Sequence, residues 1–564
     1  MRHRPHEMPP HRRYLKCGVA VLAVSLLAAP LSHAQDRSSS AQGGASQPGG
    51  ASVSAPATGA SAAEQSGGRT GVSGFVGSLI PGFAFGASVD LSESYATNPS
   101  GFSASNTDWI TMLGLGLTMN EHSARVSFDA NYHGMVDFYA NGTQSTQFTN
   151  DLQSVASVIV IPDYVNFNAS AFAQPVVISN LGAVTANGNV ASNGYRNAYG
   201  FSAGPEITFH LGDFATSVTR ATYGASYFTE PAGTSPFTGI PGVPGPQSMT
   251  MRTVSETLAS GTDFSRLSWN LNGTMQEMDR PQGLFSEKIA LGHFQYAITR
   301  EISLLGTGGY DAIHNTRALS RNLSGPIGTG GIALTLGEDF QLQFEIGEKY
   351  NDISYQGSMR WNITPTASIT GDVTDQISTP EGQLLGSLSS LVSTGNGGLA
   401  SSSALYANGT ASSLASFNAQ SPGSLSFDQN ISRFQRVNLN YSQEFPRDHA
   451  MIGVFATRQT ILDTVFVGQP VNNSWGMIAS VAHDLSRQMS ATLGGGYSNF
   501  EELGGHANVY NVNGQISYTL SPDTNVYFRT DYITRASSTS LQNLSPFTGD
   551  TDDLRVTLGL SHKL

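Results

Sequence analysis

The chain contains 564 residues, of which 28 are Lys or Arg and 41 are Asp or Glu, so that only 12% are charged, against about 25% in ordinary soluble domains. The hydrophobic content is nevertheless only 39% and the mean hydropathy is −0.15, which excludes a helical membrane protein. A single Cys excludes a disulfide framework, and no clustered Cys and His residues suggest a metal site. We therefore expect neither a resident metal nor another cofactor.

Residues 1–34 are typical of a secretory signal peptide. Five basic residues and one acid precede an apolar run from Val19 to Ala29, which is too short to cross a bilayer that needs about 20 residues. Ser32 and Ala34 then place small residues at the −3 and −1 positions of a cleavage site. We expect cleavage between Ala34 and Gln35; a short membrane anchor is the alternative.

Removal of this segment leaves 23 basic and 40 acidic residues, a net charge of −17. Nucleic-acid binding needs a basic surface, so the mature charge excludes a nucleic-acid partner. Residues 35–74 are rich in Ser, Gly and Ala and contain almost no large apolar side chain. Such a segment cannot bury a core, and we interpret it as a flexible linker.

From residue 75 to residue 564 the chain alternates between apolar and polar residues. In the last segment Leu554, Val556, Leu558 and Leu560 share one parity, while mostly polar residues occupy the other. The same period of two recurs along 126–138, 267–276 and 510–520. This period indicates strands with one apolar and one polar face.

The turns predict how these strands are connected. Ten short turns are expected near residues 121, 162, 212, 262, 300, 338, 365, 447, 486 and 522, and long segments are expected between them, such as 230–248 and 378–432. Together with an opening strand near 83–95 and a closing strand, they predict about 22 strands, within the range 18–24. Short turns on one rim and long loops on the other are typical of a transmembrane β-barrel.

The predicted fold is therefore all-β, a single large antiparallel transmembrane β-barrel over residues 75–564. A soluble propeller or β-helix is the alternative, but it would repeat a motif at a fixed spacing. The long loop at 378–432 either folds inward and narrows the lumen or stays outside the barrel.

Charged residues within the predicted strands are candidates for the lumen wall. A basic residue that faces lipid at the bilayer midplane costs about 2 to 4 kcal/mol, so these side chains are expected to point inward. There they either tune ion preference or form cross-strand ion pairs that stabilise the wall. The candidates are Arg125, Asp129, Asp137, Arg266, Glu345, Arg360, Arg436, Arg529, Asp531 and Arg535.

The hairpins 518–524 (YTLSPDT) and 361–367 (WNITPTA), with the glycine-rich segments 493–497 and 305–310, resemble bacterial outer-membrane β-barrel porins, some of which are linked with exopolysaccharide systems. The resemblance covers about 75–564. It consists of the general pattern of hairpins and glycine-rich segments and includes no specific motif. It implies location in the outer membrane of a Gram-negative envelope, with outer-membrane lipid, lipopolysaccharide and the barrel-assembly machinery as partners. Such barrels usually end in an aromatic residue, whereas this chain ends in Leu564.

The leading functional hypothesis is a porin-like channel for passive or weakly selective passage of small hydrophilic solutes, saccharides or ions. A secretion or structural barrel associated with exopolysaccharide is the alternative, which predicts aromatic side chains such as Phe172 and Tyr527 in the lumen. An enzyme on the barrel wall is a remote alternative. The sequence contains one match to the G-x-S-x-G motif of a nucleophile elbow, at 200–204. This match lies inside an alternating segment, whereas a nucleophile elbow joins a strand to a helix. We do not expect an enzyme.

Overall fold

Alternation of apolar and polar side chains produces strands throughout the described chain. The computed structural model describes residues 84–99, 106–177, 195–228, 248–280, 283–316, 323–379, 431–462, 471–502, 505–539 and 550–564. The predicted signal peptide, its cleavage site at Ala34 and Gln35, and the linker lie outside these residues. None of the described residues forms a helix that could cross a membrane.

Twenty-two antiparallel strands form one sheet. The first eleven are β1 (Ala84–Ala96), β2 (Asp108–His122), β3 (Val126–Tyr139), β4 (Gln147–Ile161), β5 (Val165–Val177), β6 (Tyr195–Leu211), β7 (Ala215–Phe228), β8 (Met249–Ser260), β9 (Leu267–Arg280), β10 (Gly283–Ala297) and β11 (Ile302–Asn315). The others are β12 (Gly325–Leu336), β13 (Phe340–Lys349), β14 (Asp352–Thr364), β15 (Ala367–Ser378), β16 (Ser432–Glu444), β17 (Asp448–Ile461), β18 (Val471–Asp484), β19 (Met489–Glu502), β20 (Gly505–Ser521), β21 (Thr524–Thr539) and β22 (Thr551–Lys563).

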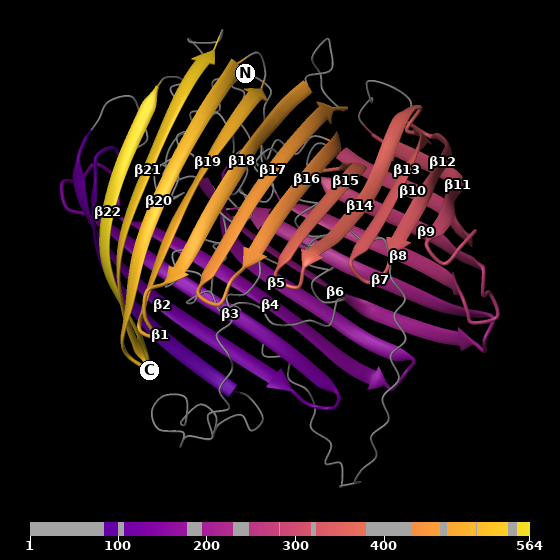
Figure 1. Ribbon diagram of the computed structural model, residues 1–564, viewed down its shortest axis with the longest axis horizontal. Helices are drawn as coiled ribbons and strands as arrows, with labels where there is room; N and C mark the ends of the chain where they lie inside the picture. The colour runs from indigo at the N-terminus through magenta and orange to yellow at the C-terminus, as the bar shows by residue number, and fades with distance from the viewer. Residues whose placement is uncertain are drawn as a thin grey trace, which may run out of the picture. The chain divides into compact units, whose positions relative to one another are not determined.

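The sheet closes on itself. Each strand pairs with its neighbours in sequence, and β1 also pairs with β22, from Ser88 opposite Lys563 to Ala96 opposite Arg555. Figure 1 shows the result, with the orange and yellow strands in front of the indigo and purple ones. The predicted all-β barrel of about 22 strands is confirmed.

The two rims of the barrel differ in their connections. On one side, here called the turn rim, ten connections of two to six residues join β2 to β3, β4 to β5 and so on to β20 and β21. They coincide with the ten predicted turns, and the chain ends on the same rim (Figure 1). The opposite side, the loop rim, carries the longer connections, including 229–248 and 379–431.

Three connections on the loop rim are unexpectedly short. Only two residues separate β9 from β10, β13 from β14 and β19 from β20. In the second of these, Tyr350 and Asn351 both have positive φ, 58° and 55°, as a tight hairpin turn requires. The prediction of long loops along the whole of this rim was therefore too simple.

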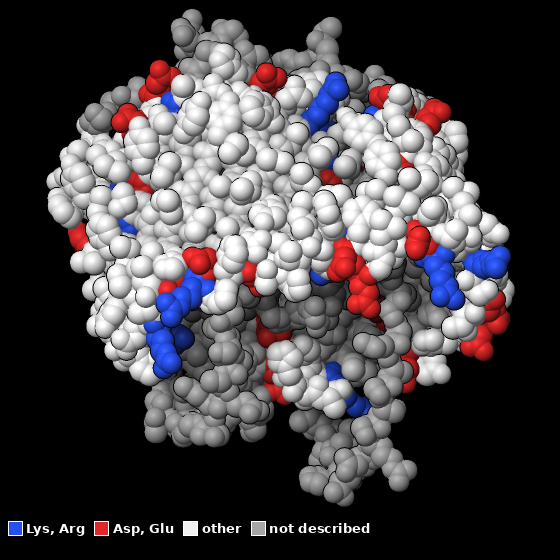
Figure 2. Space-filling view, viewed as in Figure 1, with Lys and Arg blue, Asp and Glu red and all other residues white. Residues whose placement is uncertain are grey.

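The period of two separates an outer from an inner face. Large apolar side chains are exposed on alternate positions of most strands, for example Leu113 and Leu115 on β2 and Leu558 and Leu560 on β22. The intervening positions are mainly polar and often buried. Figure 2 shows a broad outer band with few charged side chains between two regions where charges are frequent.

Candidate functional site: the inner wall of the barrel

The predicted wall charges divide into two groups. The first group lies within strands, at positions whose sequence neighbours are outward-facing, and therefore on the inner face: Asp129, Asp137, Glu345, Arg360, Arg436, Arg529, Asp531 and Arg535. On β21, for example, the exposed rings of Phe528 and Tyr532 face outward on either side of Arg529 and Asp531. Arg125 and Arg266 instead lie in exposed turns at the turn rim, each one residue before a strand begins, which corrects their assignment to strand faces.

Opposite charges meet on strands β21 and β22. The Arg529 guanidinium donates to the Asp531 carboxylate, with Nη2 and Oδ1 2.7 Å apart, because residues i and i+2 share a face. Asp531 is also in register with Arg555 of β22, which is only 1% exposed. Arg555 is an inner-wall charge that was absent from the predicted set.

The inner face of β1 to β4 is acidic. Five aspartates face inward there, and no Lys or Arg occurs within these four strands. The five are Asp90, Asp108, Asp129, Asp137 and Asp151. His122 lies 3.4 Å from Asp129, and the charge of Arg555 attracts Asp137 from β22.

His133 pairs with an acid that the sequence did not indicate. Its Nε2 atom lies 3.2 Å from Oδ2 of Asp90, and its side chain is 2% exposed. The two residues come from β3 and β1, and Gly114 of the intervening strand β2 lies between them. The two side chains border a small pocket that is also lined by Ser92 and Tyr527.

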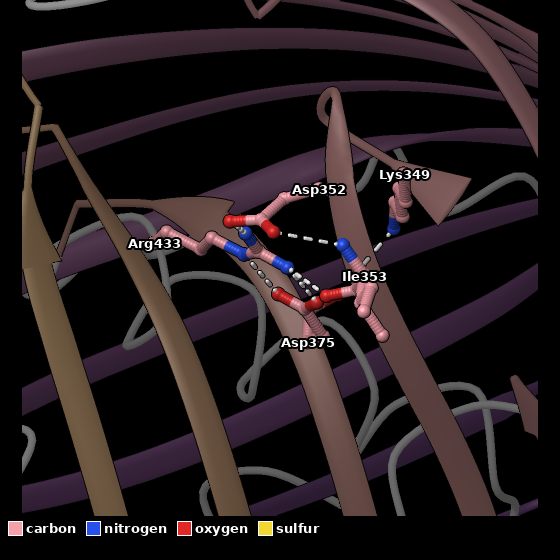
Figure 3. A network of polar contacts seen from close by, with 5 residues as sticks. All are labelled: Lys349, Asp352, Ile353, Asp375 and Arg433. Carbon is pink, nitrogen blue, oxygen red and sulfur yellow. Dashed lines mark hydrogen bonds and ion pairs between the residues drawn. The ribbon is translucent and has the colours of Figure 1, made fainter. Parts of the chain in front are cut away.

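A second buried network ties together the loop-rim ends of β14, β15 and β16 (Figure 3). Arg433 donates from Nε to Oδ1 of Asp375 at 2.8 Å, and from Nη1 to Oδ2 of Asp352 at 3.1 Å. It also donates to the carbonyl oxygen of Ile353 at 2.9 Å. The side chain of Asp375 is fully buried and that of Arg433 is 6% exposed, so the pair is shielded from water.

Lys349 extends this network along the wall. Its Nζ atom lies 3.4 Å from the backbone oxygen of Asp375, and its charge attracts Glu287 of β10 and Asp311 of β11. These two acids are diagonal neighbours, since Glu287 is opposite Ile313 while Asp311 is opposite Ile289. None of these residues was among the predicted wall charges.

Hydroxyl groups bind the one predicted carboxylate of β13. Glu345 accepts a hydrogen bond from Thr307 of β11, with the oxygen atoms 2.7 Å apart, and another from Thr329 of β12. The Thr307 hydroxyl is in turn 2.9 Å from Nδ1 of His293 on β10. Glu345 therefore belongs to a polar chain that crosses four strands.

Two aromatic rings of the inner wall lie against glycines. Phe172 is directly opposite Gly200, and Tyr527 is directly opposite Gly559. A Cβ atom at either glycine would lie 2.2 Å from the ring, and Phe172 is only 3% exposed. These rings therefore cover the bare backbone of a glycine, a known device in β-sheets.

The G-x-S-x-G match at 200–204 is part of a strand. Ser202 lies in the middle of β6 with its side chain buried on the inner face, so it does not join a strand to a helix as a nucleophile elbow must.

The predicted long loop begins with an unexpected contact. Thr379, the first residue after β15, is buried, and its Oγ1 atom lies 3.9 Å from the Sδ atoms of Met249 on β8 and Met278 on β9. The remainder of the loop, residues 380–430, lies outside the described residues, and its inward or outward course stays a prediction.

No family model and no curated protein matches the sequence. Solved structures do match. The match to the FrpB iron transporter from Neisseria meningitidis covers 86% of this chain and 83% of the FrpB chain, with a TM-score of 0.46 and 12% sequence identity. The match to the siderophore receptor PirA from Pseudomonas aeruginosa covers 85% of this chain and 80% of the PirA chain, with a TM-score of 0.37 and 9% sequence identity.

The match to OccK1 (OpdK) from Pseudomonas aeruginosa covers 85% of this chain and 99% of the OccK1 chain, with a TM-score of 0.33 and 8% sequence identity. Such low values leave the function to be argued from the barrel itself. The chain is a closed 22-stranded antiparallel β-barrel with an apolar outer surface and a polar, charged inner wall.

Proposed function

We propose that this protein is an outer-membrane channel for passive, weakly selective passage of small hydrophilic solutes or ions. The observation that carries the proposal is the segregation of side chains by the closed sheet: apolar groups are exposed on the outer face, and acids, bases and hydroxyls line the inner face. An apolar outer band suits lipid, and a polar interior suits water.

The distribution of charge supports a weak preference for cations. Strands β1 to β4 present five aspartates inward and no Lys or Arg, whereas the bases of β16 and β21 lie beside acids. Rings or strips of carboxylates favour cation passage. The preference is weak because bases such as Arg360 also face the lumen.

Planar-bilayer recording tests the proposal directly. The purified, refolded protein should give discrete conductance steps in KCl, and the reversal potential in a salt gradient should have the sign of a cation-preferring pore. Circular dichroism of the same sample must show β-structure. A folded barrel that leaves the bilayer silent would overturn the channel proposal.

The exopolysaccharide alternative has less support. It requires aromatic side chains that stand free in the lumen to stack against sugars, whereas Phe172 and Tyr527 lie over Gly200 and Gly559. Blocking of the ionic current by long polysaccharide chains, but not by small sugars, would favour it.

A further inference from the structure

The pairing of β15 with β14 stops before the loop rim. Strand β15 is in register with β14 from Ala367 to Val373, but its residues 374–378 are not. These residues nevertheless stay paired with β16, as far as Ser378 opposite Ser432. The loop-rim ends of β15 and β16 therefore leave the wall together. Residues 374–379 and 431–436 are here called the spur.

The outer side of the spur lies against the inner side of its neighbours. Arg433 shares its parity with Val437, which is 44% exposed on the outer face of β16. Its guanidinium nevertheless contacts Asp352, an inward-facing residue of β14 beside the exposed Ile353. Paired strands of one sheet present the same parity to the same face. This contact, drawn in Figure 3, therefore places the spur on the lumen side of β14.

Lys349 makes the same connection from β13. It follows the exposed, outward-facing Glu348, and its Nζ atom lies 3.4 Å from the backbone oxygen of Asp375. The Nζ atom also lies 4.7 Å from the centre of the Tyr350 ring, and Cζ of Arg433 lies 5.8 Å from the same centre. The space between the spur and the inner face of β13 is therefore filled by these side chains.

The tip of the spur contacts another part of the wall. Oγ1 of Thr379 lies 3.9 Å from the Sδ atoms of Met249 and Met278, which are buried on the inner faces of β8 and β9. In a round barrel of 22 strands about 4.8 Å apart, strands six or seven positions apart would be separated by about 25 Å or more. The contact at Thr379 therefore divides the lumen at the loop rim.

The two parts of the divided lumen differ in size. The smaller part is enclosed by the seven strands β9 to β15, and the larger part by the other fifteen. A ring of about eight strands is just wide enough for its own side chains to fill, whereas about 16 strands leave an aqueous channel. In the smaller part Met278, Phe285, Asp311 and Tyr350 are each at most 3% exposed, as this difference in size predicts.

We propose that the spur closes the smaller part at the loop rim, so that ions pass only through the larger part, along the face of the spur that carries Gln376. The inference rests on the proposed channel function. Gln376 lies between the buried Asp375 and Ile377 and is itself exposed, so it faces the larger part. The smaller part is a recess that opens toward the turn rim, where Gln341 and Gln343 of β13 are exposed.

Cross-linking within one chain tests the position of the spur, because the only native Cys is Cys17 in the predicted signal peptide. In liposomes, a short bifunctional methanethiosulfonate should join Thr379→Cys to Met249→Cys or to Met278→Cys. The matched control pairs Thr379→Cys with Thr551→Cys. Thr551 begins β22, which is as many strands from β15 as β8 is, on the other side.

Mass spectrometry of the cross-linked peptides gives the result, and heat-modifiable migration on gels shows that each variant is folded. Cross-linking of the control pair to the same extent, or of neither methionine position, would overturn the division of the lumen.

Ion selectivity tests the pathway. In Gln376→Cys, a negatively charged methanethiosulfonate adduct should shift the reversal potential in a KCl gradient toward cation selectivity, and a positively charged adduct should shift it toward anion selectivity. Ile289→Cys is the matched control, because Ile289 is half-buried on the inner face of β10, opposite Asp311 and behind the spur. Neither adduct should have an effect there, since salt at 0.1 M screens charges beyond about 10 Å.

The outcomes separate the pathway from the channel function. Equal shifts at positions 376 and 289, or no shift at a fully modified position 376, would overturn the proposed pathway. A barrel that forms the cross-link at Thr379 but leaves the bilayer silent would overturn the channel function and leave the division of the lumen in place.

Discussion

The Nε2 atom of His133 lies 3.2 Å from the carboxylate of Asp90 although a complete strand separates the two residues. The contact crosses β2 at Gly114, which is in register with Asp90 on one side and with Met135 on the other. Because Gly114 has no side chain, the imidazole and the carboxylate meet above its backbone. The contact links β1 to β3, next to the closure of the barrel.

Replacement of Gly114 by Ala should separate this pair. The new Cβ would lie 2.9 Å from Nε2 of His133 and 3.1 Å from Cβ of Asp90, so at least one of the two side chains must move. We expect a loss of about 1 to 3 kcal/mol in the free energy of unfolding, which is usual for overpacking.

Urea unfolding in lipid vesicles, followed by tryptophan fluorescence, measures this change. Gly306→Ala on β11 is the matched control, because a Cβ there would have nothing within 4 Å. Equal midpoints for the two variants would show that Gly114 is not required for the contact.

The positions of the strands could be predicted because their determinants are local. Turn-forming residues such as those of 521–523 and 162–164 lie between segments with a clear period of two, and ten turns followed from them. The two-residue connection at Tyr350 and Asn351 was not predicted, because no glycine or proline marks it.

The ionic contacts could not be predicted, since they depend on pairing between distant segments. Arg433 is 58 residues from Asp375 and 81 from Asp352, and only the register of β15 with β16 brings the first pair together. The outward-facing Glu256 of β8, which is exposed beside Val254, was missed for another reason. In β8, MTMRTVSETLAS, both parities mix polar with apolar residues, so the pattern does not say which face meets lipid.

Arg433→Ala should destabilise the barrel much more than the loss of an exposed arginine. It leaves the fully buried Asp375 carboxylate without its main partner, and breaking a buried ion pair costs about 3 to 5 kcal/mol. Thermal unfolding in detergent, monitored by the loss of β-sheet circular dichroism, measures the effect.

Arg360→Ala is the control for Arg433→Ala, because Arg360 also faces the lumen but is exposed. A second substitution, Asp375→Asn, should restore part of the stability of Arg433→Ala by removing the unpaired charge. If the double variant is less stable than Arg433→Ala, the buried charge is not the cause of the loss.

Gly559→Ala should change the lumen more than the stability. Its Cβ would lie 2.2 Å from Cζ of Tyr527, and a tyrosine ring can rotate away from the wall and into the pore. We expect a lower single-channel conductance with an almost unchanged unfolding midpoint. Gly330→Ala, where a Cβ meets nothing within 4 Å, should alter neither quantity. An unchanged conductance for Gly559→Ala would mean that the ring does not enter the ion pathway.

The single substitutions of Arg529 and Asp531 should shift ion selectivity in opposite directions, and the double substitution should leave it nearly unchanged. The two side chains form an ion pair on the inner face of β21, with Nη2 and Oδ1 2.7 Å apart, so their fields largely cancel at a distance. Arg529→Gln removes one of the two arginines beside Asp531 and should shift the reversal potential in a KCl gradient toward cation selectivity. Asp531→Asn should shift it toward anion selectivity, and the double variant should return close to the unsubstituted protein.

The exposed turn residue Arg266 supplies a control, Arg266→Gln, of the same charge change as Arg529→Gln. Reversal potentials that stay constant in both single variants would place the pair outside the ion pathway and leave it a purely structural contact.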